Sequence, residues 1–289
     1  DCLLSRGLGD VYKRQDIDQC KRLWNDIVEM QRKGKVGHFV GSIVNIAEQA
    51  MPTGVQKYMI IDGQQRMTTL TLLLLALRDY AIKNPNDTTI NARRIDNMLL
   101  KNEYESGDER YKLLLTETDR DVLISLVEEK PIAEGTRSRL IENYNFFAGK
   151  LADKVIQPAE VYESIGKLQI VNITLDRAVD DAQAIFESLN STGKELSESD
   201  LIRNYVLMGL EPSEQTYVYE HLWRPMEQLF IYETQGTVMD AFFRHYLTMK
   251  LSRIPKQGRV YEEFKLYHLN CEFGTIRELC QDLFEYAKS

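Results

Sequence analysis

The stretch IIDGQQRMTTL, residues 60–70, joins two apolar elements through five residues, DGQQR, four of which are polar. KYMIID (57–62) has the β-branched and aromatic residues typical of a strand, and the leucine-rich run after it predicts a helix over 67–82. Leucines lie on both faces of that helix, which indicates that it is buried. The stretch therefore predicts a strand that passes directly into a central helix.

The residues before this stretch predict two further elements. HFVGSIVNI (38–46) is rich in β-branched residues, and the connection with Pro and Gly that follows it favours antiparallel pairing with 57–62. DIDQCKRLWNDIVEMQRKG (16–34) predicts a helix that ends at Gly34. The apolar face of that helix is formed by Cys20, Leu23, Trp24, Ile27 and Val28.

Beyond residue 84 the chain alternates helical patterns with polar connections. A strand is expected at 168–176 and a short one within 102–115, and the other patterns are helical: 92–100, 119–129, 136–155, 181–190, 197–210, 214–230, 238–251 and 261–270. No internal repeat is visible. The predicted fold class is α+β, with a small mixed sheet near the N-terminus and a predominantly helical remainder.

Composition excludes several classes of protein. Four cysteines without CxxC spacing and four dispersed histidines argue against a zinc site and are typical of reduced, cytoplasmic thiols. The longest apolar run, 70–77, is far too short to span a membrane. The net charge of −8 argues against a surface coated with basic residues for nonspecific nucleic-acid binding, although it leaves room for a local basic patch.

The first fifteen residues, DCLLSRGLGDVYKRQ, show neither helical nor strand periodicity and no secretory signal. They resemble translated adapter sequence of the kind found at the ends of metagenomic gene models. We therefore expect residues 1–15 to be a non-native segment outside the fold.

The polar residues of the opening stretch have the chemistry of an anion site. Gly63 allows a tight turn and close approach of a ligand, and the first-turn amides of a helix favour negative charge. Arg66 can contact phosphate through two N–H groups, while Gln64 and Gln65 can bond to phosphate, base or water. Asp62 can hold Mg²⁺ or position water. This site is not a P-loop, because GxxxxGK[ST] is absent.

A purely structural interpretation of the same residues is also open. Asp62 would then cap the helix, the glutamines would be solvated, and Arg66 would form an ion pair.

A second polar group lies in FESLNSTGKELSESDLIRNYVL, residues 186–207. Residues 190–193 predict a turn with Gly193 at positive φ, and Ser197 with Asp200 three residues later predicts a helix cap. Asn190, Lys194 and Arg203 could face a shared pocket, although an arginine such as Arg203 is more often in an ion pair on a helix surface.

IIDGQQRMTTL and FESLNSTGKELSESDLIRNYVL, in this order, resemble the N-terminal domain family of GmrSD-type restriction endonucleases. HFVGSIV and LWNDI are similar to segments of that family, and the likeness covers about residues 20–210. The resemblance implies a ParB/sulfiredoxin-like α/β core with added helices. It also implies binding and hydrolysis of a nucleoside triphosphate with Mg²⁺ at the DGQQR motif, coupled to cleavage of modified phage DNA in a prokaryotic cytoplasm.

Under this resemblance the catalytic residues are Asp62, Gln64, Gln65 and Arg66, with Asp62 as the metal ligand. The nucleotide is expected to contact residues of both motifs: Gly63, Arg66, Thr68, Asn190 and Gly193. The expected organisation is a core at 16–84, a helical insertion at 85–167, a segment at 168–210 that completes the core, and a helical extension at 211–289.

Two features depart from the family. Its usual IP-x-YQR-x-Y-x-W opening is replaced here by the adapter-like string, and no His-Asn-His cluster indicates the HNH-type nuclease domain that often follows. The chain is therefore expected to be a fragment that works with an HNH nuclease domain or subunit. A homo-oligomer of the chain is a further possibility. The alternatives are a ParB-like DNA- or protein-binding module with a structural DGQQR loop, and, with less support, a nuclease acting on its own.

Overall fold

A computed structural model describes residues 2–4, 17–47, 55–115, 117–133, 135–136, 138–175, 197–208, 210–230 and 237–288. The chain forms two compact units, Asp1–Val179 and Asp180–Ser289, and each is considered by itself. The boundary falls inside the segment 168–210 that was expected to complete the core as one piece. The strand at its start belongs to the first unit, and the helix at its end belongs to the second.

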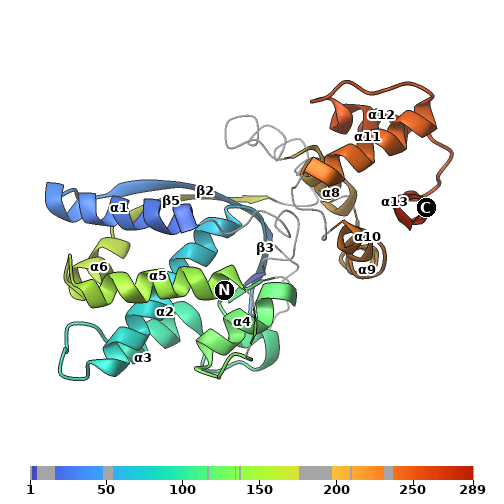
Figure 1. The fold of residues 1–289 in the computed structure, drawn as a ribbon. Helices are drawn as coiled ribbons and strands as arrows, with labels where there is room; N and C mark the ends of the chain where they lie inside the picture. Colours follow the sequence, from blue (N-terminus) through green and yellow to red (C-terminus); the bar gives the residue numbers. More distant parts are fainter. Residues whose placement is uncertain are drawn as a thin grey trace. The chain divides into compact units, whose positions relative to one another are not determined.

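The first unit contains a five-stranded mixed sheet with the order β4-β1-β3-β2-β5. Figure 1 labels three of its strands, β2, β3 and β5. Its strands are β1 (Cys2–Leu4), β2 (His38–Ala47), β3 (Lys57–Asp62), β4 (Leu113–Leu114) and β5 (Leu168–Leu175). β2 pairs antiparallel with β3 and parallel with β5, and β1 pairs parallel with both β3 and β4. The α+β class, the strands at 38–46, 57–62 and 168–176 and the antiparallel pairing are confirmed.

The expectation that residues 1–15 lie outside the fold is wrong for β1. The backbone of Cys2–Leu4 lies between β3 and β4, with Leu3 opposite both Tyr58 and Leu113. A strand of three residues carries no detectable periodicity, and its position is set by backbone hydrogen bonds to neighbours that are distant in sequence. Residues 5–16 lie outside the described part of the chain.

Helix α1 (Ile17–Lys33) packs the predicted apolar face into the core. Cys20, Leu23, Trp24 and Ile27 are buried, and Val28 is partly buried against them. Gly34 follows the helix with a φ of 58°, the left-handed conformation in which glycine commonly ends a helix.

Helix α2 (Gln64–Lys83) is the centre of this core and begins three residues before the predicted start. Leu72, Leu73, Leu75 and Leu77 have no exposed surface, which confirms a helix that is buried on more than one face. Its leucines share one apolar cluster with α1, with Ile43 of β2 and with Ile60 of β3.

The segment between α2 and β5 adds five helical elements and one 3-10 turn. They are α3 (Ala92–Ile95), the π-helix η1 (Asp96–Leu100), the 3-10 turn η2 (Gly107–Arg110), α4 (Glu117–Val127), α5 (Arg139–Asp153) and α6 (Pro158–Ile165). The sequence predicted the helices at 92–100, 119–129 and 136–155 and a short strand within 102–115, where β4 lies. It predicted neither η2 nor α6, a helix of two turns whose capping box is formed by Gln157 and Glu160.

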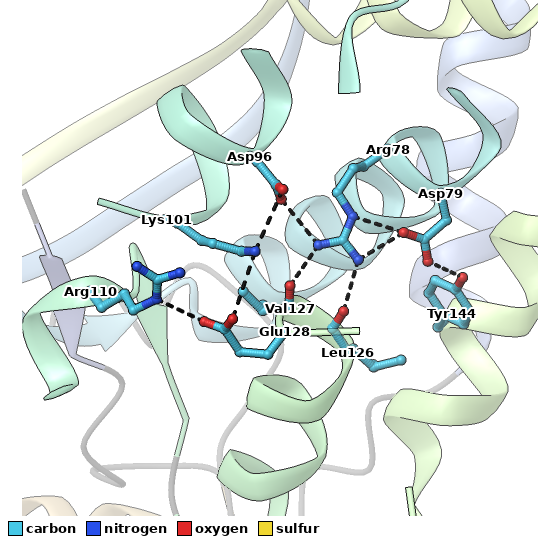
Figure 2. A network of polar contacts seen from close by, with 9 residues as sticks. All are labelled: Arg78, Asp79, Asp96, Lys101, Arg110, Leu126, Val127, Glu128 and Tyr144. Atoms are coloured by element: carbon cyan, nitrogen blue, oxygen red, sulfur yellow. Dashed lines mark hydrogen bonds and ion pairs between the residues drawn. The ribbon is translucent and has the colours of Figure 1, made fainter. Parts of the chain in front are cut away.

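A buried arginine joins these elements to α2, as Figure 2 shows. The guanidinium of Arg78 donates to Asp79, to Asp96 of η1 and to the carbonyls of Leu126 and Val127 at the end of α4. Burial opposes the charged form, but the two carboxylates raise the pKa of Arg78 above its usual value, so the side chain stays charged.

The network continues on both sides of Arg78. Asp79 accepts a hydrogen bond from Tyr144 of α5, and Lys101 bridges Asp96 and Glu128. Four helical elements are thereby connected through polar groups beneath the surface.

The regular secondary structure among the described residues of the second unit is entirely helical. Its elements are α8 (Glu198–Met208), α9 (Pro212–Val218), the π-helix η3 (Tyr219–Trp223), α10 (Arg224–Leu229), α11 (Thr237–Leu251), α12 (Val260–Asn270) and α13 (Ile276–Lys288). Aromatic rings fill its core: Phe243 of α11 stacks on Trp223 and meets Phe264 of α12 edge to face. The helical patterns at 197–210, 214–230, 238–251 and 261–270 are confirmed, and α13 is additional.

The first prediction tests the central position of α2. Leu73→Ala should lower the free energy of unfolding by about 2–5 kcal/mol, because it removes buried methyl groups and leaves a cavity. Leu74→Ala should act in the same direction. Urea denaturation measures both, with Leu266→Ala at an exposed position as the control. Leucine variants as stable as the parent would show that α2 is not central.

The second prediction concerns Arg78. Replacing it with Met leaves Asp79 and Asp96 without their shared cation, which should cost roughly 3–5 kcal/mol. Arg78→Lys keeps the charge but cannot supply the fork of N–H groups, so its loss should be smaller than that of Arg78→Met. Equal stability of Arg78→Met and the parent in urea denaturation would contradict this account.

Candidate functional site

The junction between β3 and α2 requires a glycine at position 63. Gly63 has a φ of 90°, a left-handed conformation that side chains with a Cβ rarely adopt. A Cβ there would lie 3.0 Å from the carbonyl oxygen of Ser42 and 3.0 Å from Ile43. The N-cap therefore has no side chain to bond to the first-turn amides of α2, and the helix begins in contact with the backbone of β2.

Arg66 lies across β2 at a second glycine. A Cβ on Gly41 would lie 2.6 Å from Nε of Arg66, so the guanidinium occupies the space that a side chain would fill. Its Nη1 donates to the carbonyl oxygen of Ser42 and lies 3.9 Å from the carboxylate of Asp62. The structure thus brings together the two charged ends of the motif.

The Asp62–Arg66 pair is accessible to a ligand. The two side chains are 41% and 37% exposed, and an ion pair in such a position contributes little stability. A phosphate could therefore replace Asp62 as the partner of Arg66 at small cost. Neither Gly41 nor Ser42 was among the predicted site residues, but a glycine inside a strand is a signal of close approach by another group.

Gln64 and Thr68 are turned into the protein. Both are buried: Gln64 Nε2 donates to the carbonyl of Ile60 over 2.9 Å, and the Thr68 hydroxyl donates to the carbonyl of Gln64 over the same distance. Gln65 is partly exposed. In the described conformation the surface of the motif is therefore formed by Asp62, Gln65 and Arg66.

An amide pair that sequence reasoning missed lies in the neighbouring strands. Asn45 of β2, opposite Ile60 in the sheet, is 1% exposed and donates to Asn172 of β5 over 2.6 Å. Among the residues that the structure describes, the Oδ1 atom of Asn45 has no hydrogen-bond partner. Asparagine is rare in strands, so its presence within two β-branched runs was an available signal.

The second predicted group is only partly described. Asn190, Gly193 and Lys194 lie outside the described residues. Ser197 accepts from the backbone N–H of Asp200 and donates to its carboxylate, which confirms the cap of α8.

Arg203 does not lie on the surface. It is 2% exposed and pairs with Asp200 and with Glu227 of α10, each over 3.0 Å. The expectation of a surface ion pair is therefore wrong. Glu227 belongs to α10, and the sequence pattern of α8 gives no sign that α10 packs against Arg203.

Within the described ranges no three His, Cys, Asp or Glu side chains are grouped as a metal site would require. None of the helices in the described part of the chain is long and apolar enough to cross a membrane.

Comparison with protein families gives one match. Residues 12–207 match the family model for the N-terminal domain of the GmrSD restriction endonuclease. The match includes the β3–α2 junction and α8. A comparison with curated proteins found no significant match.

The third prediction separates two reasons for the glycine at the junction. Gly63→Ala should destabilise the chain by about 1–3 kcal/mol through its backbone conformation, and by more through the contact with Ser42. Gly135 has a φ of 82° and nothing within 4 Å, so Gly135→Ala carries only the backbone penalty. Thermal unfolding measures both, and equal losses would show that the contact with β2 is unimportant.

Proposed function

Because the chain belongs to the GmrSD restriction endonuclease N-terminal domain family, we propose that it is the nucleotide-binding and nucleotide-hydrolysing sensor module of a modification-dependent restriction system. The observation that carries the proposal is the β3–α2 junction: uncapped first-turn amides, a glycine backbone and the half-exposed Asp62–Arg66 pair at one place. Such a combination suits the phosphates of a nucleotide.

In this proposal the residues of the motif have different roles. Arg66 contacts phosphate, and its bond to Ser42 together with its contact with Gly41 keeps the guanidinium at the start of α2. Gln65 contacts phosphate or water. Gln64 and Thr68 act indirectly, because their bonds to the main chain hold the strand end and the first helical turn together.

Asp62 fits a magnesium site of the kind that nucleotides bring with them. Mg²⁺ commonly takes one or two carboxylates, water and the phosphates of its substrate, so one half-exposed carboxylate is a sufficient protein contribution. When bound, the ion would neutralise charge on the phosphates. Asp62 would hold that ion or accept a hydrogen bond from the attacking water.

In this proposal hydrolysis is coupled to the cleavage of modified DNA by an HNH-type nuclease domain or subunit. The family to which the chain belongs supports a DNA-acting restriction system. The coupling to nucleotide turnover is our inference from the site.

One observation favours a different function, a binding module without turnover. Gln64 and Thr68 are buried and bonded to the main chain, and Arg66 donates to a backbone carbonyl. Such contacts would also be expected of a motif that only shapes the turn. The two functions differ in whether the chain binds and hydrolyses nucleotide.

The fourth prediction tests binding at the motif. Arg66→Ala should weaken binding of a nucleoside triphosphate with Mg²⁺ by about 1.5–3 kcal/mol, the usual contribution of a hydrogen bond to a charged group. This corresponds to roughly a ten- to hundredfold rise in Kd. Calorimetry on the parent and the variant measures the change, with Arg32→Ala on the exposed end of α1 as a control for lost charge.

Asp62→Asn keeps the size of the side chain and removes its charge, so it should reduce phosphate release more than binding. A parent chain that binds none of the four triphosphates would favour the binding module. Binding that survives Arg66→Ala unchanged would place the pocket elsewhere.

A further inference from the structure

The distribution of charge in the second unit is uneven. The chain carries a net charge of −8, yet residues 241–261 contain no Asp or Glu. The same residues contain five cations: Arg244, Lys250, Arg253, Lys256 and Arg259. They form most of α11, the connection to α12 and the first two residues of α12, whose first turn continues with Glu262 and Glu263.

The connection at 252–259 is held in a defined shape. Ser252 and Gly258 have φ values of 53° and 82°, and the N–H of Arg259 bonds to the carbonyl of Lys256 over 3.1 Å. Pro255 is buried, and its carbonyl accepts from Nε of Arg244 over 2.9 Å. We call residues 252–259 the basic loop.

Arg253 has a structural role in the basic loop. Both ends of its guanidinium bond to the carboxylate of Glu263 in α12, so its charge is matched. The same contact lowers the pKa of Glu263, which keeps that carboxylate ionised. Arg253 therefore ties the loop to α12 and contributes little net charge.

Lys256 and Arg259 are available to a partner. Lys256 is exposed, and no ion pair of its ammonium group is found among the described residues. Arg259 is 61% exposed and bonds to Glu262, which is itself 58% exposed, so this pair is readily exchanged. Ile254 is 68% exposed and lies in the sequence between Arg253, which is paired with Glu263, and these two cations.

We propose that the basic loop contacts the phosphate backbone of duplex DNA through Lys256 and Arg259, with Arg253 positioning the loop. This inference rests on the DNA-directed part of the proposed function. An acidic protein repels DNA over most of its surface, so binding requires a local cluster of exposed cations without neighbouring excess acid. Such contacts orient a protein on DNA and do not read sequence.

The fifth prediction tests this surface with the double variant Lys256→Gln/Arg259→Gln of the full chain. Binding of a short plain duplex is measured by fluorescence anisotropy over a range of KCl concentrations, without nucleotide. Each lost phosphate contact should reduce the slope of log K against log salt by about 0.9, or roughly 1.8 for the pair. Affinity at low salt should fall accordingly.

The control variant Lys33→Gln/Lys130→Gln removes the same charge from two exposed positions of the first unit and should leave the slope unchanged. Unaltered thermal unfolding verifies that all variants are folded. A parent that does not bind the duplex at low salt, or a double variant with the slope of the parent, would overturn the proposal. Because nucleotide is absent, neither result depends on the site at Asp62 and Arg66.

Discussion

The charge of Arg78, which has no exposed surface, constrains how the helices of the first unit pack together. A buried cation is tolerated only when several acceptors surround it, and here they come from α2, η1 and the carboxyl end of α4. The carbonyls of Leu126 and Val127 at the end of α4 are also the natural partners of a cation, because the helix dipole is negative there. Moving α2 relative to these elements would leave charges or carbonyls unsatisfied, so the helix has one position.

The fixed position of α2 also determines the geometry of the candidate site, because the start of α2 is held in place as well. There the constraint is close packing of backbone: Gly63 against Ser42 and Ile43 of β2, and the Arg66 side chain against Gly41. A helix fixed by polar groups near its end and by glycine contacts at its start presents the first-turn amides in a single direction. Preorganisation of this kind is what an anion site needs, since the protein does not reorganise when the ligand binds.

The sequence predicted the parts of the fold in which a local pattern and burial agree. β2, β3 and α2 have long apolar runs, and a strand ending in Asp-Gly before a leucine helix has few other interpretations. β1 could not be predicted, because three residues have no period and their pairing depends on partners more than fifty residues away. Burial of Arg203 depends on Glu227, and the contact of Arg66 depends on Gly41, so in both cases the decisive residue lies on another element.

Four arginines of this chain fall into two groups according to the exposure of their side chains and of their carboxylate partners. Arg78 and Arg203 are buried beside two carboxylates each, so their charge is matched and a ligand could reach them only by unfolding the core. Arg66 and Arg259 each face one carboxylate that is itself half-exposed, and water already weakens both pairs. A phosphate that displaces the carboxylate then leaves that carboxylate hydrated, whereas at Arg78 it would leave two carboxylates that are each only 20% exposed. Exchange of partners is therefore inexpensive at the surface pairs, and this difference is the reason that we propose ligand binding at the start of α2 and at the basic loop.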